Sequence, residues 1–289
     1  CWSDCGRIPV MTEARQFHVL LTNDDGHQAP GIRTLQQVLK QHDYRVTLVA
    51  PSEEQSATSM ATTTRRNMPL QDLGDDGWHL DGQPADTVLV ALDHLLRDDP
   101  PDLVLSGINF GPNLGVGLHA SGTIGAAMVA LLNGYPAIAI SAGMSWQEAT
   151  ERPRLFPSTH RVLEPAAEFT CNLIQSLRET ADEPDSLLPP GIMLNINYPP
   201  LPRAEIKGVV YPEVSDGNLA ILGYHRCDET GHVVPRYRAS VDPDQPQLQN
   251  GDVRAHMEGY ITVSPIKPSW NPPAAEARKL MGRQEGKLG

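Results

Sequence analysis

Short apolar runs alternate with amphipathic stretches along the first two thirds of the chain, and this alternation predicts strands and helices in turn. The run His18–Thr22 stops at the turn sequence Asn23-Asp24-Asp25-Gly26, which is typical of a buried strand followed by a loop. Pro30 then occupies a first-turn helix position, apolar residues follow at helical spacing, and Tyr44–Ala50 is the next strand. A strand, a helix and a strand in this order predict a βαβ unit with parallel strands.

The alternation resumes after the polar stretch Ser52–Gly77, which we expect to be irregular. The patterns predict further helices after Pro84, over 121–132 and across Val162–Leu177, and further strands at Asp102–Leu105, Ala137–Ser141 and Ile192–Asn197. The whole order predicts an α/β protein with a Rossmann-like, doubly wound and mainly parallel sheet.

The pattern changes after Pro200, because strands are predicted there without long helices between them. These strands are Ile206–Tyr211, Val233–Tyr237 and Tyr260–Pro265. The polar stretch Tyr224–Asp252 suits a projecting hairpin or arm. The predicted organisation is an N-terminal extension at 1–16, an α/β core at 17–200, C-terminal strands with an oligomerisation arm at 201–266, and a tail at 267–289.

Charge and apolar content exclude several classes of protein. The 289 residues carry 23 basic and 35 acidic side chains, a net charge of −12, which argues against a nucleic-acid polymer as partner because such binding needs phosphate neutralisation. No run in the sequence approaches the roughly 18 consecutive apolar residues that a membrane span needs, so a membrane span is not expected. Residues 1–16 lack the apolar segment of a secretory signal peptide, so secretion is not expected either. Four scattered cysteines are too few for a disulfide framework.

Polar side chains cluster after three of the predicted strands, and in open α/β sheets ligands bind at the carboxyl ends of the strands. Asp24 and Asp25 follow the first strand, where two hard oxygen donors suit Mg²⁺ or Mn²⁺. The alternative is an ordinary turn in which Asp24 caps the loop and Asp25-Gly26 supplies the bend. Ser56, after the second strand, is a weak neutral metal ligand, and here a plain polar loop is the stronger interpretation.

The third cluster is the glycine-rich segment Ser106–Gly117, followed by Ser121-Gly122-Thr123 at a predicted helix start. Backbone N–H groups of glycines and of a helix N-terminus favour a phosphate. The alternative is a turn that only reverses the chain. His27, His119, His232 and His256 show no zinc spacing and are interpreted as solvated loop histidines.

Two familiar motifs are absent from the sequence, and a third is absent at the first strand. The sequence lacks the motif G-x-x-x-x-G-K-[ST], which disfavours a Walker-type triphosphatase. It also lacks the G-x-S-x-G nucleophile elbow, which disfavours a serine hydrolase with the common catalytic triad. The adjacent acids Asp24 and Asp25 do not form the D-x-D of an aspartyl-phosphate-forming phosphatase of the haloacid dehalogenase type.

Taken together, these segments closely resemble the survival protein E (SurE) family of metal-dependent nucleotidases. The resemblance covers about Phe17 to Ile266, and it is carried by LLTNDDGHQAPGIRTL (Leu20–Leu35), VAPSEEQSATS (Val49–Ser59), DGQPADTV (Asp81–Val88), DLVLSGINFGPNLG (Asp102–Gly115), SGTIGAAM (Ser121–Met128) and GYITVSPI (Gly259–Ile266). The sixteen residues before the first strand and the arm from Gly223 to Gln249 depart from the family pattern, so no arm residue is assigned a role.

The resemblance implies one divalent metal ion per subunit, Mg²⁺ or Mn²⁺, on Asp24, Asp25, Ser56 and Asn109. It implies Asp24 and Asp25 as catalytic residues, and phosphate contacts from Asn109, Ser121, Gly122 and Thr123. The implied activity is hydrolysis of nucleoside 5′- and 3′-monophosphates, with short polyphosphate as a further substrate, in a cytoplasmic homodimer or homotetramer without a nucleic-acid or membrane partner. The alternative is a non-catalytic module that binds an anion or a nucleotide on the same fold.

Overall fold

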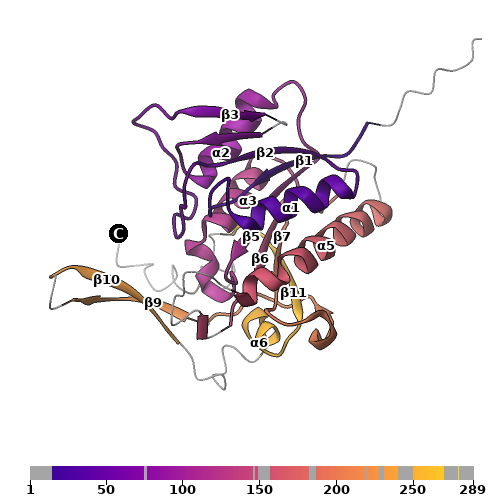
Figure 1. Ribbon diagram of the computed structural model, residues 1–289. Helices are drawn as coiled ribbons and strands as arrows, with labels where there is room; N and C mark the ends of the chain where they lie inside the picture. The colour runs from indigo at the N-terminus through magenta and orange to yellow at the C-terminus, as the bar shows by residue number, and fades with distance from the viewer. Residues whose placement is uncertain are drawn as a thin grey trace, which may run out of the picture.

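The apolar runs of the sequence form the strands of one nine-stranded sheet, in the order β3-β4-β2-β1-β5-β6-β7-β11-β8 (Figure 1). The structure is a computed structural model that describes residues 15–74, 77–145, 147–148, 157–181, 187–218, 220–227, 231–239, 250–269 and 279. Strands β4, β2, β1, β5, β6 and β7 are parallel, whereas β3 pairs antiparallel with β4, and β11 pairs antiparallel with β7 but parallel with β8. This confirms the Rossmann-like, doubly wound α/β prediction.

The strands of this sheet have the following bounds: β1 His18–Thr22, β2 Arg45–Pro51, β3 Leu70–Gly74, β4 Gly77–Leu80, β5 Leu103–Phe110, β6 Ala137–Ala142, β7 Met193–Tyr198, β8 Val209–Val210 and β11 Ile261–Ile266. The helices are α1 Pro30–Gln41, α2 Pro84–Val90, η1 Ala91–Leu95, η2 Gly115–Ala120, α3 Gly122–Leu132, α5 Pro157–Thr180, η3 Arg203–Glu205 and α6 Asp252–Met257. Most predicted elements therefore form within a few residues of their expected positions.

Helices cover both faces of the sheet, and each face has its own apolar core. Alternate strand residues such as Leu21 and Leu105 pack with α1 and α5 on one face. The residues between them, such as Leu20 and Val104, pack with α2 and α3 on the other. Strands buried on both faces are continuous apolar runs, and for this reason they could be found in the sequence.

Three predictions about elements are wrong. Ser52–Gly77 is not irregular throughout, because Leu70–Gly74 forms β3, an edge strand whose mostly exposed side chains give no apolar signal. The strand predicted at Ile206–Tyr211 is reduced to Val209–Val210. The third strand continues beyond Leu105 to Phe110, since an irregular register between Ser106 and Asn109 lets it stay paired with β6.

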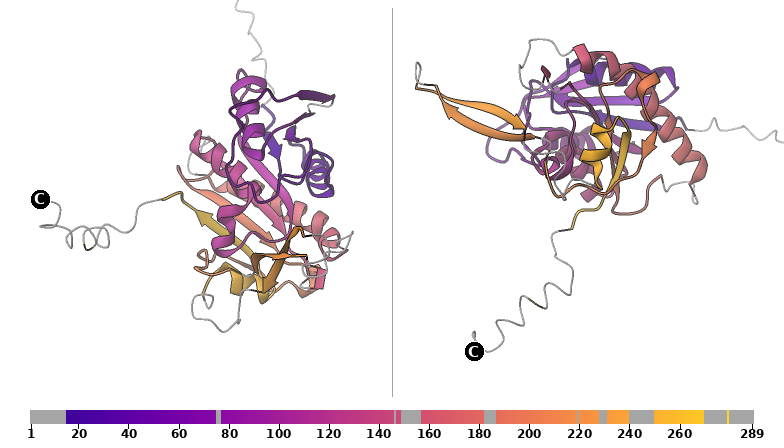
Figure 2. Two further views of the ribbon diagram at one scale, coloured as in Figure 1. Left: turned by 90° about the vertical axis from the view of Figure 1, so that its left-hand side faces the viewer. Right: turned by 90° about the horizontal axis from the view of Figure 1, so that it is seen from below.

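A hairpin after residue 218 projects away from the body of the protein, as Figure 1 and the right-hand view of Figure 2 show. Its strands, β9 Ala220–Arg226 and β10 Val233–Ala239, form a separate two-stranded antiparallel sheet. The hairpin agrees with the prediction that the first part of the arm is a projecting hairpin. Residues 240–249 of the predicted arm lie outside the described residues. The predicted N-terminal extension and C-terminal tail lie outside them too, except for residues 15–16, 267–269 and 279.

Candidate functional site

The strand order places the two main polar segments beside each other. From β1 the chain first proceeds to β2 and β4 on one side, and then returns to β5 on the other side of β1. The pairing of Thr22 with Ser106 sets the ends of β1 and β5 side by side. The point where the direction of winding reverses is where ligands bind in open α/β sheets, and Asp24, Asp25 and Asn109 all follow or end these two strands.

Asp24 lies beneath the N-terminus of α3 and is only 3% exposed. The Thr123 hydroxyl donates a hydrogen bond of 2.5 Å to its Oδ1 atom. A β-carbon added to Gly122 would lie 2.9 Å from Asp24 Oδ2, so only a glycine allows the helix to approach the carboxylate this closely. The site thus joins the first turn of α3 to the loop after β1.

Asp25 and Asn109 are brought together by the end of β5. The backbone N–H of Phe110 donates to Asp25 Oδ2 at 3.2 Å, so the half-buried carboxylate lies at the residue that follows Asn109. The Asn109 amide donates to the Gly111 carbonyl at 2.7 Å. Because that bond fixes the amide nitrogen, the Asn109 oxygen faces the opposite way and is the atom available for a cation.

Ser56 stands on a loop that is fastened over the same region. The Gln55 N–H donates to the Asp24 carbonyl at 2.7 Å, and the Ser59 N–H donates to the Ala120 carbonyl at 3.1 Å. The exposed Ser56 hydroxyl itself donates to Glu54 at 2.9 Å. The structure therefore brings the Ser56 loop to the site, with the Ser56 hydroxyl directed to Glu54, a carboxylate that the sequence argument did not single out.

The electrostatics of the two aspartates are unfavourable without a counter-ion. Burial, and then the charge of Asp24, raises the pKa of Asp25 to about 8, although the Phe110 N–H opposes this shift. Burial also raises the pKa of Asp24, against hydrogen bonds from Thr123 that favour its charged form. Glu54 adds a negative charge that raises the pKa of both. The charges acting on this pair are thus predominantly negative.

These residues fit a hard divalent cation. A buried and a half-buried carboxylate whose charge is uncompensated, with a carboxamide oxygen beside them, form the oxygen-rich donor set that Mg²⁺ and Mn²⁺ prefer. In the part of the chain that the structure describes, no three His, Cys, Asp or Glu side chains gather into a metal-binding cluster. A cation on Asp24 and Asp25 would therefore complete its shell with neutral oxygens or water.

The N-terminus of α3 carries Ser121, Gly122 and Thr123, which were predicted to contact phosphate. Ser121 caps the helix, since its Oγ accepts from the Ile124 N–H at 3.2 Å, and its own hydrogen is left to donate. Thr123 is fully buried, and both its hydroxyl and its backbone N–H are directed to Asp24. The Thr123 side chain is therefore bonded to the Asp24 carboxylate, and its predicted contact with phosphate stays a prediction.

The glycine-rich loop after β5 is clamped by residues that the sequence argument missed. The side-chain amides of Asn195 and Asn197 on β7 donate to the Asn113 carbonyl at 2.8 and 3.0 Å. The Asn113 side chain donates to Ser141 on β6 at 2.9 Å. Two asparagines spaced by two within the otherwise apolar strand β7 were the available signal, because strand residues at that spacing share one face.

Two of the four histidines considered from the sequence are not solvated. His27 is 7% and His256 is 6% exposed, and burial lowers the pKa of His256 to about 4. The imidazole of His27 stacks on that of His79 with ring centroids 4.4 Å apart. The interpretation of these two as solvated loop histidines is therefore wrong, whereas His119 and His232 are exposed as expected.

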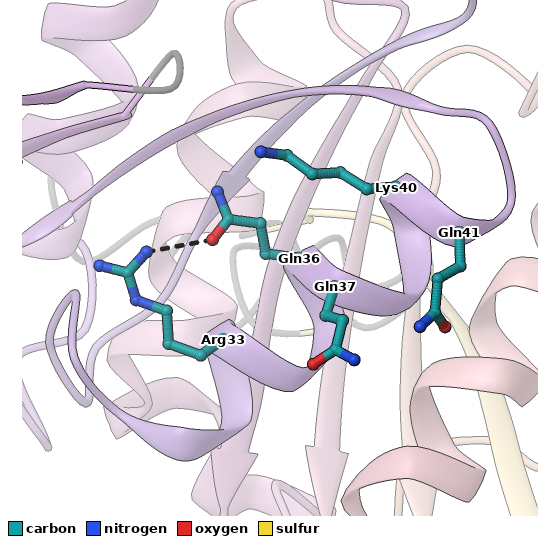
Figure 3. A pocket seen from close by; sticks show the side chains of 5 residues that line it. All are labelled: Arg33, Gln36, Gln37, Lys40 and Gln41. Carbon is teal, nitrogen blue, oxygen red and sulfur yellow. Dashed lines mark hydrogen bonds between the residues drawn. The ribbon is translucent and has the colours of Figure 1, made fainter.

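A surface hollow lies away from the candidate site. A cavity of about 430 Å³ is lined by five polar residues on the outer face of α1, Arg33, Gln36, Gln37, Lys40 and Gln41 (Figure 3). The Arg33 guanidinium donates to Gln36 at 3.1 Å within it. None of the predicted site residues lines this cavity. The candidate site is therefore identified from its position at the strand ends and not from the size of a cavity.

The parallel sheet, its reversal at β1 and β5 and the carboxylate pair at that point define a Rossmann-like α/β protein with its polar site at the switch point. The family model of Survival protein SurE matches residues 19–220. The chain belongs to the SurE family.

Individual proteins agree with this assignment. A 5′-nucleotidase SurE of Carboxydothermus hydrogenoformans is 45% identical over 257 residues, which cover 86% of this chain and 90% of that protein. The 5′-nucleotidase SurE 1 of Burkholderia lata is 36% identical over 263 residues, 89% of this chain and 93% of that one. The crystal structure of the SurE protein from Aquifex aeolicus matches with a TM-score of 0.73 at 28% identity, covering 93% of this chain and 99% of that chain.

Proposed function

We propose that the protein is a 5′-nucleotidase, a phosphomonoesterase that hydrolyses nucleoside 5′-monophosphates to nucleoside and phosphate. The observation that carries this proposal is the adjacent pair of Asp24, buried beneath the N-terminus of α3, and the half-buried Asp25. A carboxylate pair fit for a cation, next to a helix N-terminus, suits a phosphate dianion that must be neutralised and held. Relatives named 5′-nucleotidase SurE, 36% and 45% identical over most of their length, support it.

The proposed cofactor is one Mg²⁺ or Mn²⁺ ion per subunit, held by Asp24, Asp25, Ser56 and Asn109. Bound there, it would supply positive charge to the phosphate oxygens and lower the pKa of a water molecule. The directions of the pKa shifts of Asp24 and Asp25 support a cation at this place, because a positive charge would relieve the cost of burying both carboxylates.

The proposed phosphate subsite is the first turn of α3. The Ser121 hydroxyl and the backbone N–H of Gly122 would donate to non-bridging phosphate oxygens, with Asn109 at the opposite side. Such donors stabilise the charge that the phosphoryl group carries in the transition state. Thr123 contributes by holding Asp24, as its hydroxyl contact indicates.

In the proposed reaction a water molecule attacks phosphorus and the Asp24 carboxylate receives a proton from it, while the bond from phosphorus to the ribose oxygen breaks and this oxygen takes up a proton from solvent to give the nucleoside hydroxyl. Asp25 serves mainly as an anchor for the cation. Nucleoside 3′-monophosphates and short polyphosphate are further proposed substrates, and the cytoplasmic location and the dimeric or tetrameric assembly likewise stay proposals that rest on the resemblance.

The deciding experiment is phosphate release from AMP by the purified protein, with and without EDTA, Mg²⁺ and Mn²⁺. We expect turnover that EDTA abolishes and added metal restores. The Asp24→Asn variant, purified identically, controls for a contaminating phosphatase. The alternative, a non-catalytic anion-binding module, predicts AMP binding without phosphate release and is not favoured by the relatives. Full turnover in metal-stripped protein would remove the metal mechanism.

A further inference from the structure

A fully buried carboxylate lies outside the proposed site, where the arm joins the body of the protein. Asp252, the first residue of α6, is 0% exposed. Its Oδ1 atom accepts from the backbone N–H groups of Ser215 at 2.9 Å, Val253 at 2.8 Å and Gly115 at 3.2 Å. Its Oδ2 atom accepts from the Gly115 N–H at 3.1 Å. A charge buried at this depth is tolerated because hydrogen bonds surround it.

These contacts connect three separate parts of the chain. Ser215 lies just before the hairpin β9–β10, and Asp252 lies just after the arm, so both ends of the arm meet at this carboxylate. The Asp252 N–H also donates to the Glu213 carbonyl at 2.9 Å. Gly115, the third part, lies in the chain between Asn109, near the end of β5, and Ser121, the N-cap of α3. This stretch, 109–121, contains the glycine-rich loop and is called the loop below.

The loop also packs closely against residues 213–217, the segment that enters the arm and is called the arm base below. Gly115 has φ +54°, in the left-handed region, and a β-carbon there would lie 1.8 Å from the Gly217 carbonyl oxygen. The Val116 N–H donates to that same carbonyl at 3.3 Å. A glycine at 115 therefore permits a direct contact between the loop and the segment that enters the arm.

We propose that Asp252 is a positioning residue that couples the arm to the glycine-rich loop and holds this loop in the geometry the reaction needs. The proposal rests on the proposed nucleotidase function. One end of the loop carries Asn109, beside Asp25, and its other end carries Ser121, at the phosphate subsite. Asn195 and Asn197 fix the loop at Asn113, and Asp252 fixes it at Gly115. A shift at Gly115 would therefore move groups that contact metal and phosphate.

The Asp252→Asn variant tests this coupling selectively. With its amide oxygen in the Oδ1 place, it keeps the bonds from Ser215 and Val253, which maintain the arm base. Its NH₂ group then replaces Oδ2 and meets the Gly115 N–H, which keeps only its 3.2 Å bond to Oδ1, so two donors face each other only at the loop. We expect kcat/KM for AMP to fall about ten- to a hundredfold, the usual cost of a small misplacement of reacting groups, at a temperature where the variant is folded.

Hydrogen exchange gives a readout that is independent of turnover. The amides of Gly115 and Val116 should exchange faster in Asp252→Asn, whereas excess Mn²⁺ should not restore its activity because Asp24 and Asp25 are intact. Asp216→Asn, the same chemical change at an exposed position of the arm base, is the matched control and should retain wild-type rates. Gly115→Ala, which displaces the loop from Gly217, should reproduce the kinetic loss.

Three results would overturn the coupling. The first is a wild-type kcat/KM in folded Asp252→Asn, even if the melting temperature of the variant is lower. Faster exchange at Gly115 with unchanged kcat/KM would restrict Asp252 to a structural role. An equal loss in Asp216→Asn would show a general effect of charge. If the wild-type protein itself does not hydrolyse AMP, the proposed function fails, and the exchange measurement still reports whether Asp252 holds the loop.

Discussion

The Thr123 hydroxyl, in the first turn of α3, donates a hydrogen bond of 2.5 Å to Asp24 Oδ1, in the loop after β1. Both side chains are buried, at 0% and 3% exposure. The bond fixes one carboxylate oxygen and leaves Oδ2, which lies beside Gly122, as the atom facing the proposed phosphate subsite. The orientation of Asp24 is therefore set by a residue 99 positions away in sequence.

Thr123→Val should lower kcat about tenfold while the protein stays folded. Valine fills the same volume but removes the donor, and a hydrogen bond to a charged group is worth roughly 1.5–3 kcal/mol. Thr123→Ser keeps the hydroxyl and should retain most of the activity. Steady-state kinetics with AMP at saturating Mg²⁺ measure both variants.

A second buried threonine provides the control for this comparison. Thr170, in α5, is 0% exposed, and its hydroxyl donates to the Ala166 carbonyl at 2.8 Å. Neither residue belongs to the proposed site. Thr170→Val should leave kcat unchanged. Equal kcat for Thr123→Val, Thr123→Ser and wild type would refute the positioning role of the Thr123 hydroxyl.

Asp24 and Asp25 should not be equivalent when each is changed to asparagine. Asp24→Asn keeps an oxygen ligand but loses the basic carboxylate, so activity should fall by about 10²–10⁴, the usual effect of a positioned base, while metal still binds. Asp25→Asn should weaken metal affinity, and excess Mn²⁺ should partly restore its activity. Calorimetric Mn²⁺ titration and kinetics distinguish the two. Equal rescue of both variants by metal, or a phosphorylated Asp24 trapped by rapid quench, would contradict this division of roles.

The sequence predicted the elements that are buried on both faces and the polar clusters at their ends. Strand β1, helix α1 and the cap at Ser121 were predictable because apolar periodicity and turn residues are local properties. The edge strand β3 was not, because its side chains are mostly exposed. The contact between Thr123 and Asp24 and the contact between Asp252 and Gly115 depend on tertiary packing across the fold, which no local pattern encodes.

The stability of the metal-free protein should depend on pH through Asp25. Burial and Asp24 raise the pKa of Asp25 to about 8 in the folded protein, whereas an unfolded aspartate has a pKa near ~3.9. The folded state therefore binds more protons between these values, and stability should fall as the pH rises through this range. Relative to Asp25→Asn, the melting temperature of metal-free wild type should decrease from pH 5 to pH 8.

Measuring the difference between the two proteins removes the titrations of groups that do not interact with Asp25. Burial lowers the pKa of His256 to about 4, so His256 gives an opposite dependence, with stability lost as the pH falls below the usual histidine value. That effect is common to both proteins and cancels in the difference. Saturating Mg²⁺ should remove the dependence on Asp25, since a cation compensates both carboxylates. A difference in melting temperature that does not vary with pH would show that Asp25 titrates normally.

Removal of the arm should change the subunit count. The hairpin exposes apolar side chains away from the body, with Tyr224 at 69% and Val233 at 65% exposure, and such surfaces gain stability by packing on a neighbouring subunit. A short glycine–serine linker in place of residues 219–249 is feasible because Glu213 pairs with Gly251, which keeps the two ends close, and it retains Asp252. Light scattering should then report a smaller assembly than the wild type, and Tyr224→Ser with Val233→Ser should shift it in the same direction. If the subunit count is unchanged in both variants, the arm does not hold the assembly together.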